Sequence, residues 1–487
     1  MKGVKVRFAP SPTGFLHVGG LRTAYYNYLY AKKQGGTFVL RIEDTDQTRL
    51  VKGAVENLIE TLHWAGIEYD EGPELSKKDS RGENGPYRQS ERLDIYTEYV
   101  NQLVENDYAY HCFCSQERLE KVRKQQQEMN RRSQYDKHCR KLSKEERMSR
   151  LDAGMPHVIR MKIPEDDGTV EFSDKVRGEV AIPHENLDDQ ILMKSDGFPT
   201  YHMANVVDDH LMGITHVIRG EEWLPSTPKH ILLYEYFDWE PPVFAHLPLL
   251  LNEDRSKLSK RQGDVAVEDY REKGYLPEAL TNFVALLGWS PGDDEEILST
   301  KELIRKFSLD RINKSGAVFN VEKLQWMNGM YIRETETDRL VDLAQPFLEE
   351  AGFDTGNRRK MTLIIDAVKE NLRYLAEIPE VTEVFQPTPL NIDTEAEPEL
   401  GEMLAKDSSK QVFAALADQF EEQEEITKDT FMAIMKSVQK DTGVKGKDLW
   451  MPVRIALTGE MHGPELPAVI EILGKDLCIK RFRDQLG

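Results

Sequence analysis

The sequence predicts an α/β fold with a parallel sheet at its core, followed by a long helical region. Two observations indicate this fold class. An alternating run at residues 4–8 and an apolar run at residues 37–42 each predict a strand, and each is followed by a helix-like segment. Strands that alternate with helices in this way are typical of a parallel sheet with helices on its faces. From about residue 270 to the end, apolar residues recur at helical spacing and strand-like runs are few.

Size and charge limit the classes of protein. A chain of 487 residues is too long for one core, and at about 150 residues per domain it predicts three or more domains. The net charge of −21 argues against a surface devoted to nucleic acid, although it does not exclude a local basic face. No apolar run approaches the length of a membrane span, and the charged N-terminus does not resemble a signal peptide. We therefore expect a cytoplasmic protein that does not enter a membrane.

A loop rich in glycine and proline, residues 10–20, joins the first predicted strand to the first predicted helix. A helix N-terminus offers unpaired N–H groups and a positive dipole end, which suit a phosphate. Gly19 and Gly20 would let a flat ligand approach the backbone, and His17 could hydrogen-bond a phosphate oxygen. The alternative is a tight strand-to-helix turn with a buried histidine, and the loop alone does not decide between the two.

The second strand, residues 37–42, runs into the acidic residues Glu43 and Asp44. A predicted helix, residues 53–64, follows, and then a polar, glycine-rich loop, residues 74–85, that we expect to be a surface insertion.

Three of the four cysteines lie within residues 112–139, too few and too clustered for a disulfide framework. Cys112 and Cys114 are separated by one residue and cannot easily bridge to each other. Together with Cys139 and one more ligand they could form a closed tetrahedral zinc site. Tyr135 and His138 are both available as the fourth ligand, and reduced cysteines in a small core are the alternative.

The same region is the most basic of the chain. Residues 118–150 hold 12 lysines and arginines against five acids. This pattern is either a solvated helical face or a contact for a phosphate backbone.

The strand pattern returns near residue 191. Residues 214–218 form a predicted strand that ends in Arg219, and residues 243–251 form another that leads into a loop. That loop contains Lys257, Ser259 and Lys260, which could clamp a polyphosphate, although such a pattern is more often a solvated turn. Beyond residue 270 we expect helices, with proline-rich joints and an acidic segment at 391–428 that contains exposed helix surface.

The polar residues at the ends of the predicted strands indicate one shared site. Ligands of open parallel sheets bind at the carboxyl ends of the strands. Arg7 and Arg219 lie at two such ends, and guanidinium groups bind carboxylates bidentately. The histidine–glycine helix start and the lysine loop favour a nucleoside triphosphate. Together these features predict a carboxylate substrate that is activated by ATP.

Several motifs, in order along nearly the whole chain, resemble the bacterial glutamyl-tRNA synthetases, a family of class I aminoacyl-tRNA synthetases. Arg7-Phe8-Ala9-Pro10-Ser11-Pro12-Thr13-Gly14 with His17-Val18-Gly19-Gly20 is similar to the family's HIGH region. Lys257-Leu258-Ser259-Lys260-Arg261 is similar to its KMSKS loop. Further similar stretches are residues 41–46, 85–90, 201–209, 216–222, 445–452 and 462–467.

The resemblance implies a Rossmann-type catalytic core with an inserted acceptor-stem-binding domain, followed by all-α anticodon-binding domains. The expected boundaries are 1–96 and 197–255 for the two halves of the core, 97–196 for the insertion, 256–335 for a stem-contact region, and 336–395 and 396–487 for two helical domains. The implied reaction joins L-glutamate to the 3′ end of tRNA(Glu) through glutamyl-adenylate, and its first step usually waits for tRNA. The implied protein is a monomer.

The resemblance also implies residue roles. Glutamate would be held by Arg7, Ser11, Glu43, Tyr201, Asn205 and Arg219. ATP would be held by Pro10, His17, Gly19, Gly20, Lys257, Ser259 and Lys260, with His17, Lys257 and Lys260 as the catalytic groups. These three would stabilise charge on the reacting phosphate, since phosphoryl-type transfer depends on positioning and charge neutralisation. Mg²⁺ is expected on ATP without a protein cage of its own.

Two departures from the family pattern matter. The HIGH region reads His-Val-Gly-Gly and lacks the second histidine of the general class I motif, which is ordinary for glutamate-specific members. Cys112, Cys114 and Cys139 match the family's zinc motif, but the histidine that some members carry two residues after the last cysteine is Lys141 here. Tyr135 is therefore the preferred fourth zinc ligand.

Three other functions compete with this interpretation. A glutaminyl-tRNA synthetase would have an anticodon-binding part of β-barrel type, whereas this C-terminal part is predicted to be helical. A glutamylating enzyme that modifies a tRNA base would lack the anticodon-binding domains. A tRNA-binding paralogue without catalysis is disfavoured by intact His17, Lys257 and Lys260. A form that also charges tRNA(Gln) with glutamate is not distinguished by the sequence.

Overall fold

The structure is a computed structural model that describes residues 3–75, 80–258, 266–390, 392 and 394–486. Its contacts divide the chain into two compact units. The first comprises Met1–Tyr270 with Pro277–Val321, and the second comprises Arg271–Leu276 with Glu322–Gly487. No helix in the described part of the chain is both long enough and apolar enough to span a membrane.

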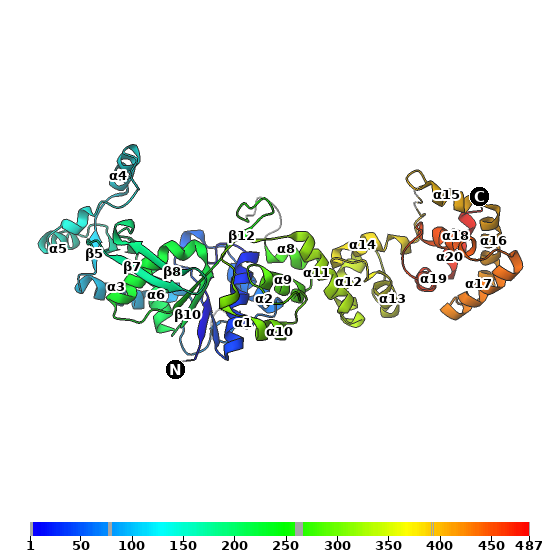
Figure 1. The fold of residues 1–487 in the computed structure, drawn as a ribbon, viewed down its shortest axis with the longest axis horizontal. Coiled ribbons are helices and arrows are strands. Elements are labelled where there is room, and N and C mark those ends of the chain that lie inside the picture. The colour runs from blue at the N-terminus through cyan, green and yellow to red at the C-terminus, as the bar shows by residue number, and fades with distance from the viewer. Residues whose placement is uncertain (1–2, 76–79, 259–265, 391, 393, 487) are drawn as a thin grey trace. The chain divides into compact units, whose positions relative to one another are not determined.

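A six-stranded sheet forms the centre of the first unit (Figure 1). Its strands, in spatial order, are β2 (Thr37–Leu40), β1 (Lys5–Phe8), β10 (His216–Gly220), β11 (Val243–Leu247), β7 (Thr169–Asp174) and β8 (Gly178–Pro183). All neighbours pair in parallel except β7 and β8, which are antiparallel. The predicted parallel sheet is thus confirmed, and β7 and β8, from within residues 97–196, extend it.

The two faces of this sheet carry different side chains because successive residues of a strand point to opposite sides. On one face, Phe38 packs edge-on against Tyr28 of α1 (Val18–Gln34). On the other, Val39, Val217 and Phe244 share a buried cluster with α3 (Leu93–Glu105), α6 (Tyr201–Leu211) and α7 (Thr227–Tyr236). Arg219 and His246 lie two positions beyond Val217 and Phe244, so they are on the same face of the sheet, the one covered by α6 and α7.

The prediction of one strand over residues 243–251 is wrong, because the structure has two strands there. β11 ends at Leu247, and Leu250–Leu251 form β12, which pairs with β13 (Ala317–Val318) in a separate two-stranded sheet. Pro248 lies between them, and a proline has no N–H to donate to a ladder, so the first strand ends there.

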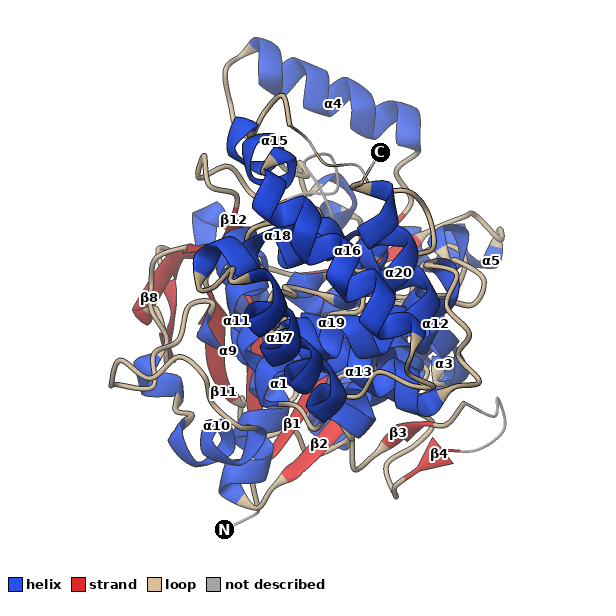
Figure 2. Cartoon of the chain, turned by 90° about the vertical axis from the view of Figure 1, so that its right-hand side faces the viewer, coloured by secondary structure: helices blue, strands red, loops and turns tan. Residues whose placement is uncertain are grey.

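The first unit contains further elements, of which α2 (Ala54–Trp64) confirms the helix predicted at residues 53–64. The others are the hairpin β3 (Gly72–Pro73) and β4 (Ser80–Arg81) seen in Figure 2, β5 (Ala109–Cys112), α4 (Gln116–Glu128), α5 (Lys144–Asp152), β6 (Val158–Met161), β9 (Ile191–Met193), α9 (Pro277–Leu286) and α10 (Thr300–Lys306), with α8 at Val267–Glu272. Strands β5, β6 and β9 form an antiparallel sheet. α4 and α5, in the basic region, bury no residue, so their charges are solvated.

The described residues of the second unit form helices joined by loops, with no strand among them (Figure 1). Its helices are α11 (Val321–Glu334), α12 (Thr337–Glu350), α13 (Arg358–Val368), α14 (Ile378–Val381), α15 (Pro398–Ala405), α16 (Asp407–Glu421), α17 (Lys428–Thr442), α18 (Lys447–Thr458), α19 (Leu466–Leu473) and α20 (Lys475–Asp484). Phe420 of α16 packs edge-on against Phe431 of α17 and Phe482 of α20, so aromatic rings join these helices. The predicted helical C-terminal region is confirmed.

Candidate active site

A cavity of about 410 Å³ opens where β1 and β10 end and where α1 and α6 begin. It brings together most of the predicted substrate residues: Arg7, Pro10, Ser11, His17, Gly19, Gly20, Glu43, Tyr201, Asn205 and Arg219. Lys257 does not line this cavity and is exposed, in a bridge with Leu251. Ser259 and Lys260 lie outside the described residues.

His17 is the N-cap of α1. Its Nδ1 accepts a hydrogen bond from the Gly19 N–H at 3.0 Å. That bond uses the Nδ1 lone pair, so the neutral imidazole carries its proton on Nε2. The residue is half-buried and lines the cavity, so it is not the buried histidine of the tight-turn alternative, and its contact with a phosphate stays a prediction.

The two glycines after His17 have packing reasons of their own. A Cβ on Gly20 would come within 2.8 Å of Leu16 Cδ1, closer than packed side chains allow. A Cβ on Gly19 would lie 3.3 Å from His17 Nδ1, so the glycine lets the imidazole fold back onto the helix start. Both positions therefore shape the loop whether or not a ligand approaches them.

A buried ion network holds Arg7 at the cavity. Arg7 Nε lies 3.1 Å from Asp209 Oδ1, and Arg41 Nη1 lies 2.7 Å from the same oxygen. Burial opposes the ionisation of Asp209, but the guanidinium groups of Arg7 and Arg41 outweigh it and lower the pKa of this carboxyl. Within the described residues, the terminal nitrogens of Arg7 have no hydrogen-bond partner, so they are available to an anion.

In the described part of the chain, the acids of this ion network are Glu43, Asp208 and Asp209. Of these three, only Glu43 lines the cavity. It accepts hydrogen bonds from Arg41 Nη2 at 3.1 Å and from Asn205 Nδ2 at 3.4 Å. Burial raises its pKa and the nearby Arg41 and Arg7 oppose that rise. A buried carboxylate of this kind would be stabilised by an ammonium group in the cavity.

Arg219 differs from Arg7 because only neutral groups hold it. It donates to Tyr201 Oη at 2.8 Å, Thr227 Oγ1 at 2.9 Å and His246 Nε2 at 3.1 Å. Across the described residues, no carboxylate forms an ion pair with this arginine, although it is only 4% exposed. A buried, uncompensated cation at a cavity wall favours an anionic ligand.

The sequence interpretation missed four residues that support these arginines. They are Asp174, Asp209, Thr227 and His246, all buried. His246 stands inside an otherwise apolar strand run, and Asp174 follows Val170 and Phe172 on the buried face of an alternating strand. A polar residue on such a buried face is the signal that could have indicated them. Asp209 lies in the stretch 201–209 that resembles the family, but the resemblance implies no role for it.

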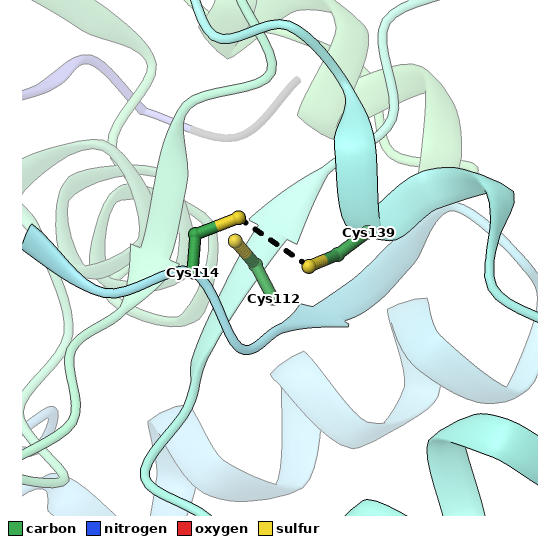
Figure 3. A group of neighbouring side chains, drawn as sticks. All are labelled: Cys112, Cys114 and Cys139. Carbon is green, nitrogen blue, oxygen red and sulfur yellow. Dashed lines mark hydrogen bonds between the residues drawn. The ribbon is translucent and has the colours of Figure 1, made fainter. Parts of the chain in front are cut away.

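The three predicted cysteines converge, and their side chains point toward one another (Figure 3). Their sulfur atoms all lie within 4.8 Å of one another, and among the described residues no histidine, aspartate or glutamate completes this group. The Tyr135 hydroxyl lies 3.2 Å from Cys112 Sγ and 3.4 Å from Cys114 Sγ. Hydrogen bonding with Cys139 and with Tyr135 lowers the pKa of the Cys112 thiol despite its burial. The three sulfurs fit three of the four positions around a tetrahedral zinc ion, and the Tyr135 hydroxyl is an oxygen that lies beside them.

Comparisons with known proteins give matches over the whole chain. A family model described as tRNA synthetases class I (E and Q), catalytic domain, matches residues 3–326, and one described as an anticodon binding domain matches residues 339–486. The glutamate–tRNA ligase of Clostridioides difficile is 51% identical, covering 98% of this chain and 98% of its own. That of Alkaliphilus metalliredigens is also 51% identical, covering 99% of each chain. A crystal structure of a glutamate tRNA ligase from Elizabethkingia meningosepticum, in complex with its amino acid, has a TM-score of 0.89 at 38% identity and covers 100% of this chain and 99% of its own.

Proposed function

The chain belongs to the class I aminoacyl-tRNA synthetases of the glutamate and glutamine group, and we propose that it ligates L-glutamate to the 3′ end of tRNA(Glu) through glutamyl-adenylate. The observation that carries the proposal is the single cavity lined by Arg7, Glu43, Arg219 and His17. The direct test is ATP-dependent acylation of purified tRNA(Glu) with labelled glutamate.

The charges around the cavity complement those of glutamate. The substrate has two carboxylates and one ammonium group, and the cavity offers two arginines and one buried acid. Glu43, held by Asn205, suits the ammonium group, and the terminal nitrogens of Arg7 and Arg219 suit the carboxylates. Tyr201 accepts from Arg219, so its own hydroxyl proton is directed to another acceptor, such as a substrate carboxylate.

The reaction needs positioning and charge neutralisation but no side-chain nucleophile. A glutamate α-carboxylate oxygen attacks the α-phosphorus of ATP, which forms glutamyl-adenylate and releases pyrophosphate. A terminal ribose hydroxyl of tRNA then attacks the acyl carbon and releases AMP. The Nε2–H of His17 suits a phosphate oxygen in the first step, next to Pro10, Gly19 and Gly20. Lys257, Ser259 and Lys260 are proposed to neutralise the remaining phosphates, and Mg²⁺ would accompany ATP.

The partners follow from the same proposal. tRNA(Glu) would bind the basic stretch at residues 118–150, which includes most of α4 and α5, with its acceptor end and the helices of the second unit with its anticodon. The expected state is a monomer in the cytoplasm. The domain boundaries given for the core, the insertion and the helical regions stay predictions.

Two observations favour glutamate over glutamine as the substrate. The described residues of the second unit form helices and loops but no strand, unlike a β-barrel. Arg219 carries a positive charge that no described acid neutralises, and a neutral amide would leave it uncompensated. A form that also charges tRNA(Gln) with glutamate is distinguished by the acylation assay.

We propose that Cys112, Cys114, Tyr135 and Cys139 hold one structural zinc ion. Freshly purified protein is expected to contain one zinc per chain by elemental analysis, because the donor set is closed and fits this metal. Cys139→Ser should lose most of the metal, whereas Cys478→Ala should keep it, since Cys478 is buried in α20 and belongs to no such cluster. Metal-free wild-type protein would contradict the site, and full zinc in Tyr135→Phe would contradict only the fourth ligand.

A further inference from the structure

Three neighbouring strands place one polar side chain each in a continuous row. Arg219 of β10 is the register partner of His246 on β11, and Phe244, two residues earlier, is the partner of Asp174 on β7. Arg219 Nε lies 3.1 Å from His246 Nε2, and His246 Nδ1 lies 2.6 Å from Asp174 Oδ2. The row therefore runs from the cavity wall through His246 to Asp174, with all three side chains buried.

The hydrogen bonds of this row determine which ring nitrogen of His246 carries a proton. Arg219 can only donate, so His246 Nε2 must accept from it. The hydrogen bond from His246 and those from backbone amides lower the pKa of Asp174 although burial opposes this, so its carboxylate accepts from Nδ1. The proton of the neutral ring is therefore on Nδ1. The Thr227 hydroxyl lies 3.1 Å from the same Nε2 and accepts from Arg219 Nη2, which is consistent with this tautomer.

We propose that Asp174 and His246 are positioning residues that fix the guanidinium plane of Arg219 for a substrate carboxylate, so that glutamate affinity depends on the tautomer of His246. This inference rests on the proposed role of Arg219 in the glutamate site. The proposal gives β7 a function. This strand ends 45 residues before Arg219 in the sequence, and it lies near the site because it pairs with β11 in the sheet.

A neutral histidine does what an acid could not do at this position. Asp209 orients Arg7 and at the same time neutralises part of its charge. His246 orients Arg219 through an acceptor nitrogen and leaves its charge to the ligand. Burial lowers the pKa of His246 to about 4, and the positive charge of Arg219 contributes to this shift. The ring is therefore neutral at physiological pH.

Asp174→Asn tests the proposal because it should invert the tautomer with little change in shape. The Oδ1 atom accepts from the backbone N–H groups of Val176 at 2.9 Å and Arg177 at 2.8 Å. These amides would hold the oxygen of the new side chain in place and turn its NH₂ group toward His246 Nδ1. The ring proton would move to Nε2, where it faces the Nε–H of Arg219 and removes the hydrogen bond.

The expected result for Asp174→Asn is a rise in KM for glutamate of about 10-fold or more, with KM for ATP and the melting temperature nearly unchanged. NMR of protein with ¹⁵N-labelled histidine should show His246 protonated on Nδ1 in the wild type and on Nε2 in the variant. His246→Gln should retain glutamate affinity, because its amide can donate to Asp174 and accept from Arg219, whereas His246→Leu should lose it.

Asp166→Asn is the matched control. Asp166 forms the same kind of contact with His184, at 2.5 Å, but is exposed and lies outside the cavity, so its loss should leave KM for glutamate unchanged. An unchanged KM in Asp174→Asn, or equal losses in His246→Gln and His246→Leu, would overturn the proposal. If Arg219→Met still raises KM in that case, the proposed glutamate site stands and only the positioning role fails.

Discussion

Arg219→Met is expected to lower kcat/KM for glutamate by about 10²- to 10³-fold, the largest effect of any single change in the glutamate site. Truncating one partner of a buried, hydrogen-bonded charge pair costs about 2–5 kcal/mol, and each 1.4 kcal/mol is tenfold. Arg219 is buried and has no acidic partner among the described residues, so the substrate carboxylate would supply its counter-charge. The loss should appear mainly in KM, measured by tRNA-dependent ATP–pyrophosphate exchange over a glutamate series.

Arg219→Lys serves as the graded control for this prediction. Lysine retains the charge but not the planar fork that contacts Tyr201, Thr227 and His246 together, so an intermediate loss is expected. Wild-type KM for glutamate in Arg219→Met would show that this arginine does not bind the substrate.

His17→Asn is expected to reduce the rate of adenylate formation by about 10²- to 10³-fold, the cost of removing one preorganised donor to a developing negative charge. Its melting temperature should stay close to that of the wild type. His17 caps α1 through Nδ1, and asparagine is among the best N-cap residues, so the helix start is kept while the Nε2–H donor is lost.

His17→Ala separates the two roles of this histidine. It removes both the donor and the cap, so it should lose the same activity and about 0.5–2 kcal/mol of stability in addition. Thermal unfolding and pyrophosphate exchange measured on both variants give the comparison. Normal exchange in His17→Asn would reduce this residue to a helix cap.

The sequence was sufficient to predict the elements around the cavity because their signals are local. The alternating strand at residues 5–8, the loop before α1 and the arginine at the end of β10 each depend on near neighbours in sequence. The rule that ligands bind at the carboxyl ends of parallel strands then brought Arg7, Glu43 and Arg219 to one site, and the structure places them there.

The supporting residues could not be predicted because they depend on strand order. Asp174 and His246 are 72 residues apart and meet only because β7 joins the sheet beside β11. Nothing in the local pattern of either strand indicates this pairing. The break at Pro248 had a local signal, but the apolar run on both sides of it suggested one continuous strand.

The most direct test of the proposed function is acylation of purified tRNA(Glu) and tRNA(Gln) with labelled glutamate or glutamine in the presence of ATP. We predict glutamyl-tRNA(Glu), with one AMP and one pyrophosphate formed for each amino acid attached, and no attachment of glutamine. Glutamate on tRNA(Gln) as well would identify the form that charges both tRNAs. Attachment of glutamine, or no attachment of glutamate to tRNA(Glu), would contradict the account.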